Sequence, residues 1–247
     1  MSGLLRDLRF AWRQIRKNPG VTSVAVLTLA LSIGVNTVIF DMANGFLLRP
    51  LPYPEPDRLA VLVRHQEGIS AKTGQFVQED DTSQNGETWK TARDRLRSVR
   101  LAIFGGTSGV NLASGQGAEA AVRYVQDMRV SAHYFEVPGI QPFLGRGFTE
   151  EEDRPGGPKA VVLSYSLWQS ALHADQQILG RQISLKGEPY TVVGVLPRGA
   201  QYAGIADPQV TGTADLWTPL QPHQSGECGG ENCEIIMRLL PGATWQK

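Results

Sequence analysis

The stretch Val21–Phe40, VTSVAVLTLALSIGVNTVIF, decides how this chain is organised. It contains no charged side chain. An α-helix rises about 1.5 Å per residue, so a helix of this length spans about 30 Å, which is the thickness of the hydrocarbon core of a bilayer. The stretch therefore predicts a membrane-spanning helix close to the start of the chain.

Two other interpretations of the stretch remain open, a cleaved signal peptide and a buried helix of a soluble protein. A signal peptide has a shorter apolar region, which ends in small residues of the A-x-A kind. Here the apolar region continues through Asp41-Met42-Ala43-Asn44-Gly45-Phe46-Leu47-Leu48. We therefore expect a helix and its extension over residues 21–48, and we expect it to stay in the mature protein.

Basic residues are concentrated just before the predicted helix. Residues 1–20 carry one acid, Asp7, against five bases, Arg6, Arg9, Arg13, Arg16 and Lys17. Because the formal net charge of the chain is zero, the remainder has an excess of negative charge. The positive-inside tendency places residues 1–20 in the cytoplasm and the rest of the chain outside it. The zero net charge also argues against nucleic acid as a partner.

One face of the predicted helix is polar. Thr28, Ser32 and Asn36 recur every four residues, and Ala25 lies beside them. Small and hydroxyl side chains allow membrane helices to pack together, and lipid offers Asn36 no hydrogen-bond partner. We expect further membrane helices as neighbours, from another chain or from sequence beyond this one. The alternative is that a span tolerates three mildly polar residues by chance.

A proline-rich segment, residues 49–58, follows the helix. Prolines at every second position stop a helix and favour an extended, stiff stalk. Arg49 and Tyr53 suit the level of the lipid headgroups, where a cation and an aromatic ring are both solvated.

Beyond the stalk, hydrophobic periodicity predicts a mixed α+β fold. Residues 59–138 begin as an α/β unit, with a strand at 59–63, a helix at 88–104, a glycine-rich turn at 105–109, a strand at 121–130 and a helical turn at 132–135.

Residues 139–233 are predicted to be rich in strands and loops. Their expected elements are a strand at 160–163, a helix at 165–172 capped by Ser164, a hairpin from strands at 181–185 and 190–195, and a strand at 215–219. A last strand is expected at 234–239, within the closing segment 234–247.

The motifs of common enzyme classes are absent. The sequence has no G-x-x-x-x-G-K-[ST], no H-E-x-x-H and no G-x-S-x-G. Its histidines are too scattered for a local zinc pattern: His65, His133, His173 and His223. Ser184 near Lys186 is a spacing common in strands and is not a convincing nucleophile pair. We expect no catalytic, cofactor-binding or metal-binding residues.

The densest acidic run is Thr149-Glu150-Glu151-Glu152-Asp153. It lacks the alternating oxygen ligands of a calcium loop. Thr149 followed three residues later by Glu152 is instead typical of a capping box at the start of a helical turn.

The only two cysteines, Cys228 and Cys233, lie in Cys-Gly-Gly-Glu-Asn-Cys. A disulfide is favoured if this loop is exported to an oxidising compartment. Free thiols and a metal site that includes His223 are the alternatives.

The order of segments resembles the start of MacB-like and FtsX-like ABC transporter permeases, especially the orphan duplicated permeases of acidobacterial type. The resemblance covers nearly the whole chain and rests on these stretches: RDLRFAWRQ (6–14), KNPG (17–20), LLRPLPY (47–53), LGRGF (144–148), LSYSLW (163–168), YTVVGV (190–195) and DLW (215–217).

This resemblance implies a MacB-like periplasmic core domain after the membrane helix. Residues 59–138 would form its porter-like α/β part, residues 139–233 its strand-rich inserted part, and residues 234–247 the return to the porter-like part, incomplete at the C-terminus. It also implies a location in the cell inner membrane, a periplasmic main domain, no catalytic residues, and a separate ABC ATPase as partner.

Three functions remain to be separated. The leading one is a permease component that an ABC ATPase moves, in contact with membrane lipid and further permease helices, with a homodimer as one arrangement. The second is a membrane-anchored binding or assembly module, or a non-functional fragment of such a permease. The third is an anchored periplasmic enzyme, which the lack of a convergent catalytic set disfavours.

Overall fold

The structure is a computed structural model and describes residues 12–43, 53–69, 74–114, 121–200, 213–221, 228, 230 and 232–245. The chain forms two compact units, Met1–Pro52 and Tyr53–Lys247. Each unit is described by itself.

The first unit is built on one long helix, α2, which spans Pro19–Ala43. Residues 12–17, just before it, are also helical. From Pro19 to Asp41 the helix is long and apolar enough to cross a membrane, and its apolar window is not buried against protein. The helix begins two residues before the predicted span of 21–48, and residues 44–48 lie outside the described residues.

The second unit contains a closed ring of six strands. β5 pairs with β6, β6 with β11, and β11 with β8. β8 pairs with β10, β10 with β9, and β9 returns to β5. The six strands therefore enclose a small barrel. Their bounds are β5 Val99–Ser114, β6 Ala121–Val130, β8 Ala160–Leu163, β9 Gln182–Leu185, β10 Glu188–Val195 and β11 Leu216–Pro219.

Aliphatic side chains from this ring and α4 (Tyr165–Ala171) form one buried cluster. The side chains of Val161, Leu163, Val192 and Leu216 are fully shielded from solvent. Ser164 caps α4 by accepting a hydrogen bond from the backbone N–H of Leu167 at 3.2 Å. The cap sits directly between β8 and α4, so Leu167 and Trp168 reach the barrel cluster.

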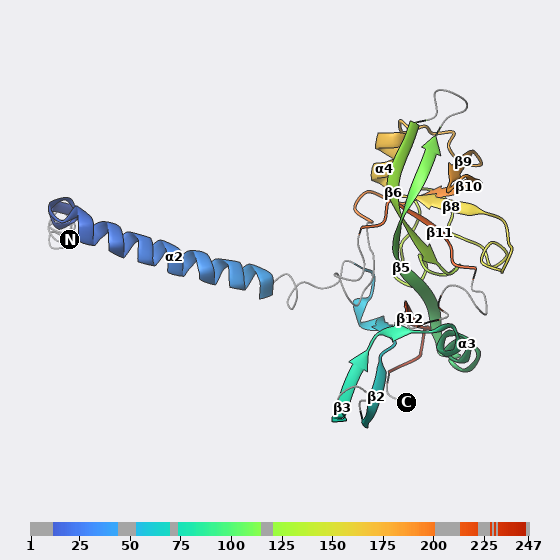
Figure 1. Cartoon of the computed structure of the whole chain (residues 1–247), viewed down its shortest axis with the longest axis horizontal. Helices are drawn as coiled ribbons and strands as arrows, with labels where there is room; N and C mark the ends of the chain where they lie inside the picture. Colours follow the sequence, from blue (N-terminus) through green and yellow to red (C-terminus); the bar gives the residue numbers. More distant parts are fainter. Residues whose placement is uncertain are drawn as a thin grey trace. The chain divides into compact units, whose positions relative to one another are not determined.

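β5 is long enough to take part in two regions of the sheet. Its first half pairs with β12 (Cys233–Leu239), and its second half pairs with β6 and β9. β12 also pairs with β1 (Leu59–Val61) and with β4 (Ser83–Gln84). Figure 1 shows β5 passing from beside β12 to beside β6. This strand joins the barrel to the β1–β12 end of the sheet.

The remaining elements extend from this framework. α3 (Gly86–Arg95) packs Trp89 and Ala92 into a cluster with β5 and β12 side chains. β2 (Arg64–Ile69) and β3 (Phe76–Asp81) pair only with each other, as a two-stranded sheet. β7 (Leu144–Gly145) pairs with the end of β10.

The strands expected at 59–63, 121–130, 160–163, 215–219 and 234–239 and the hairpin around 186–189 are all present, with bounds shifted by no more than a few residues. The expected helix at 88–104 is wrong in its second half, because α3 ends at Arg95 and β5 begins at Val99. The turn expected at 105–109 lies within β5. Pairing with β12 explains the first difference, since Val99–Gly105 match residues 239–233 one to one. Pairing with β6 explains the second, since Thr107, Ser108 and Gly109 lie opposite Met128, Asp127 and Gln126.

The predicted border between residues 138 and 139 crosses the sheet. The ring takes β5 and β6 from the region before the border and β8 to β11 from the region after it. The division into a porter-like and an inserted part stays a prediction about how the domain is organised.

Candidate functional site

The polar stripe lies on an exposed part of α2. The side chains of Ala25, Thr28, Ser32 and Asn36 are all exposed within this unit. The Thr28 hydroxyl donates to the carbonyl oxygen of Val24 at 2.8 Å, and the Ser32 hydroxyl donates to that of Thr28 at 2.8 Å. Because hydroxyl groups can be satisfied inside a helix in this way, the need for an external partner falls mainly on Asn36.

The second unit holds the start of its chain against its end, at a place that we call the entry–exit junction (residues 53–61 and 236–245). Within it, β1 and β12 run antiparallel, with Leu59 opposite Arg238 and Val61 opposite Ile236. The segment that enters the domain after the apolar helix therefore lies beside β12, the last of the described strands.

Arg238 ties three backbone segments together at the junction. Its guanidinium donates to the carbonyl oxygen of Pro54 at 2.9 Å, to that of Glu55 at 3.5 Å, and to that of Val137. Burial lowers the pKa of Arg238, while the nearby Glu55 carboxylate opposes that change. A guanidinium suits this role because its donors form a planar fork.

A second set of contacts supports the same junction. The Arg58 guanidinium donates to the carbonyl oxygen of Leu239 at 2.7 Å and to the Glu55 carboxylate at 2.6 Å. The hydrogen bond from Arg58 lowers the pKa of the Glu55 carboxyl group. The Trp245 indole N–H donates to the carbonyl oxygen of Asp57 at 2.9 Å. Entry and exit segments are thus joined by side chains from both.

Residues 53–58, the described part of the predicted stalk at 49–58, do not form the extended segment that the prolines predict. Tyr53 is buried in the second unit, which corrects its expected place at the lipid headgroups. Pro56–Arg58 forms a 3₁₀ turn, and Glu55 before it has a left-handed backbone. Gly139, whose φ is +79°, lies against Pro54, so that a Cβ there would come within 3.2 Å of the proline ring. Arg49 lies outside the described residues.

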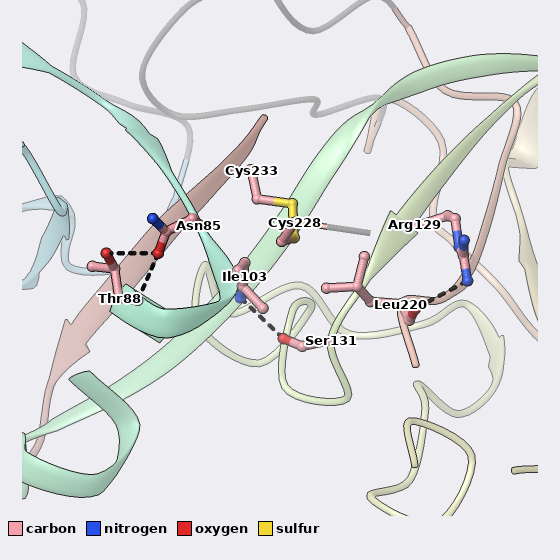
Figure 2. Close-up of a disulfide and its surroundings, with 8 residues drawn as sticks. All are labelled: Asn85, Thr88, Ile103, Arg129, Ser131, Leu220, Cys228 and Cys233. Carbon is pink, nitrogen blue, oxygen red and sulfur yellow. Dashed lines mark hydrogen bonds between the residues drawn. A yellow bond between two sulfur atoms is a disulfide. The ribbon is translucent and has the colours of Figure 1, made fainter. Parts of the chain in front are cut away.

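Cys228 and Cys233 are joined by a disulfide. Both cysteines are buried, and the carbonyl oxygen of Cys228 accepts the N–H of Gly86 at 2.7 Å. Figure 2 shows the disulfide near Asn85, which caps α3 by accepting the N–H of Thr88 at 2.9 Å. The disulfide therefore ties Cys228 to the start of β12, and the hydrogen bond from Gly86 connects Cys228 to the start of α3.

The acidic run contains the capping box that its spacing predicts. The Glu152 carboxylate accepts the N–H of Thr149 at 2.8 Å, and the Thr149 hydroxyl accepts the N–H of Glu152 at 3.3 Å. Arg146 also binds both oxygens of Glu152 at 2.8 Å. Burial raises the pKa of Glu152, but the hydrogen bonds from Arg146 and Thr149 outweigh it and leave the pKa below its ordinary value.

Asp153 serves the backbone as well. Its two oxygens accept the N–H groups of Ala132 at 3.1 Å and Gln221 at 3.0 Å. Burial raises the pKa of Asp153, against the effect of these hydrogen bonds. The acidic run thus connects three loops of the domain.

The histidines lie apart from one another. His65 is on the β2–β3 hairpin, 2.6 Å from an Asp80 oxygen, and His133 follows β6. His173 follows α4, and His223 lies outside the described residues. Within the described residues there is no group of three or more metal-ligating side chains.

Sequence reasoning missed the junction residues Arg58, Arg238 and Trp245. No local pattern marks them, because their partners lie about 180 residues away. The only available sign was an arginine in the last predicted strand, next to an otherwise apolar run.

The apolar helix α2 and the α+β domain that follows it fit one class of protein, a domain anchored to a membrane by a helix that precedes it. Comparison with protein families identifies the family within this class. The chain belongs to the family of the MacB-like periplasmic core domain, whose model matches residues 22–247. The sequence has no match among curated proteins.

The chain is similar to several solved structures at low sequence identity. A domain of a Porphyromonas gingivalis protein assigned to the permeases matches with a TM-score of 0.54 and 15% identity, over 78% of each chain. The periplasmic region of MacB from Actinobacillus actinomycetemcomitans matches with a TM-score of 0.49 and 16% identity, over 76% of this chain and 77% of that one. The extracellular domain of the noncanonic ABC-type transporter YknZ from Gram-positive bacteria matches with 0.48 and 14%, over 74% and 85%.

Proposed function

We propose that this protein is a permease component of an ABC-type transporter in the cell inner membrane, with its N-terminus in the cytoplasm and its main domain in the periplasm. A separate ABC ATPase would drive it, and its periplasmic domain would move during ATP hydrolysis. Family membership supports the class of transporter, and the basic residues before α2 support the orientation.

The entry–exit junction is the observation that carries the proposal. A domain that responds to movement of a membrane helix needs a firm connection where the chain enters it. Arg238 and Arg58 supply that connection, because they join the entering segment to β12, and β12 is paired with β5 of the barrel. Movement of the entering segment would therefore pass directly to the central sheet.

The polar stripe supports further membrane helices as neighbours of α2. Asn36 lies in the second half of an exposed apolar helix, where an amide side chain is costly unless another helix binds it. Those helices would come from a second copy of the chain, as a homodimer, or from other permease segments, with lipid around them.

The test is reconstitution of the full chain in bilayer nanodiscs with each ABC ATPase subunit of the host genome that lacks its own membrane domain. The proposal expects one subunit to bind and to change its rate of ATP hydrolysis when the chain is present. It also expects Arg238→Met to reduce that change without reducing binding. Arg95→Met, an exposed change on α3, is the matched control and should behave as wild type.

Two outcomes would decide against the proposal. If none of the ATPase subunits binds the chain, an ABC partner is excluded. If one binds but its hydrolysis rate is the same with and without the chain, the protein is a passive binding or assembly module.

A further inference from the structure

A cavity of about 650 Å³ lies beside α3 in the second unit. Its walls come from α3, the first residues of β5, the turn after β6 and the loop at residues 150–155. Arg93 and Glu150 line it and have exposed side chains. Its volume falls within the range of sites that bind small organic ligands.

One wall of the cavity is apolar. Trp89 and Leu101 are buried behind it, with exposed fractions of 8% and 7%, while Leu96 remains 38% exposed. Val99 and Leu240 complete this wall. A ligand with an apolar body would cover Leu96 and its neighbours and release water from them, which is favourable.

Three arginines line the same cavity: Arg93, Arg100 and Arg154. Arg100 is held by Glu136 at 2.8 Å. Arg93 has only a contact of 3.4 Å with Asp94, the next residue, and both side chains are exposed, so this pair is weak. Within the described part of the chain, the Arg154 side chain has no ion pair. Arg93 and Arg154 are therefore the cations that remain for an incoming group.

The acidic side chains of the cavity do not take up these cations. Both Asp153 oxygens accept backbone N–H groups, from Ala132 and Gln221. Glu150 lies 3.6 Å from His133. The cavity thus combines an apolar wall with Arg93, which is held only weakly by Asp94, and with Arg154, which has no ion pair among the described residues.

We propose that this cavity binds an amphipathic organic anion from solution, with its apolar body against Trp89, Leu96 and Val99 and its carboxylate, sulfonate or phosphate group against Arg93 and Arg154. A guanidinium binds such groups in a bidentate way, which adds both strength and orientation. The cavity shares Leu240 with the entry–exit junction but is not lined by Arg58, Arg238 or Trp245, and the inference does not rest on coupling to an ATPase.

The test uses the full chain in nanodiscs of neutral phosphatidylcholine, titrated by calorimetry with 2-naphthalenesulfonate as the probe. The uncharged 2-naphthalenemethanol is the matched ligand, and empty nanodiscs correct for partition into lipid. We expect the anion to bind at least about tenfold more tightly than the alcohol, because only the anion gains charge-assisted hydrogen bonds.

Variants locate the site. Arg93→Gln with Arg154→Gln should weaken binding of the anion by about tenfold or more and leave the alcohol unchanged. Arg95→Gln is the matched control, since Arg95 is exposed on the same helix but does not line the cavity. Circular dichroism melting checks that each variant folds. If the double variant is unfolded, the comparison of the two probes on the wild type still decides whether the cavity prefers an anion.

The inference is overturned if the anion and the alcohol bind equally, or if the folded double variant binds the anion as tightly as wild type. A repeat in nanodiscs that contain anionic phosphatidylglycerol tests the source of the ligand. Unchanged affinity for the anionic probe supports a ligand taken from solution. Loss of binding in these nanodiscs would show that anionic membrane lipid fills the cavity, and would overturn the proposal that the ligand comes from solution.

Discussion

Arg238→Met tests whether the entry–exit junction stabilises the domain. The methionine keeps much of the side-chain length but removes every donor. The guanidinium now serves the carbonyl oxygens of Pro54, Glu55 and Val137, and none of these oxygens gains a new protein donor after the change.

The expected cost follows from those three contacts. A hydrogen bond from a charged donor contributes about 1.5–3 kcal/mol when it is buried. Arg238 is only partly buried, so water replaces some of the lost donors, and we expect a loss of about 2 kcal/mol in the free energy of unfolding. For a domain of this size, that corresponds to a melting temperature lower by about 4–8 °C.

The assay is thermal unfolding of the full chain in nanodiscs, followed by circular dichroism, with Arg100→Met as the matched control. Arg100 lies directly opposite Arg238 across the β5–β12 pair. Its ion pair with Glu136 is exposed on both sides, so its loss should cost less than about 1 kcal/mol. Arg238→Lys, which keeps the charge but not the fork, should fall between wild type and Arg238→Met.

The reasoning is refuted if Arg238→Met melts at the wild-type temperature, or no lower than Arg100→Met. Either result would mean that the three carbonyl oxygens are equally well satisfied by water and that the junction is not held by Arg238.

Three further predictions concern the disulfide, the acidic run and the membrane helix. Reduction of the Cys228–Cys233 disulfide should lower the free energy of unfolding by about 2 kcal/mol, the value expected for so short a loop. Dithiothreitol should therefore lower the melting temperature of wild type but not that of the double Cys→Ser variant. An equal effect on both proteins would contradict this prediction. The pKa of Glu152 is lower in the folded domain than its ordinary value of 4.5, so the ionised carboxylate stabilises the fold above about pH 4.5 and this contribution is lost as the pH falls through the lowered pKa. Glu152→Gln should therefore flatten this part of the curve of unfolding free energy against pH, measured by urea unfolding. A curve parallel to that of wild type would rule this role of Glu152 out. Asn36→Leu should weaken association of α2 with other membrane helices by about 1 kcal/mol, or about fivefold, in an energy-transfer assay in bilayers. Ile33→Leu, a change away from the stripe, is the control. Equal association of both variants would show that the stripe is not an interface.

Several elements follow from the sequence because their signals are local. The span of α2 is set by a largely apolar run that contains no charged residue between Lys17 and Asp41. Ser164 and Thr149 form the caps that their spacing predicts, since a cap needs only residues two or three positions away. The hairpin of β9 and β10 follows from two apolar runs around Lys186-Gly187.

Other features depended on partners far away in the chain. Residues 99–104 continue the apolar pattern of α3 and look helical on their own, but seven residues of β12 pair with this end of β5 and make it a strand. Tyr53 is buried inside the domain, and contacts over about 180 residues create the junction.

The sequence by itself determined that this protein has a membrane helix, an α+β domain beyond it and the family to which both belong, because hydropathy, caps and short motifs act over a few residues. Only the tertiary structure decided that six strands close into a ring, that Arg238 joins the two ends of the domain, and that two arginines meet an apolar wall in one cavity. The physical reason is that each of these depends on pairing between residues far apart in the chain, which no local pattern encodes.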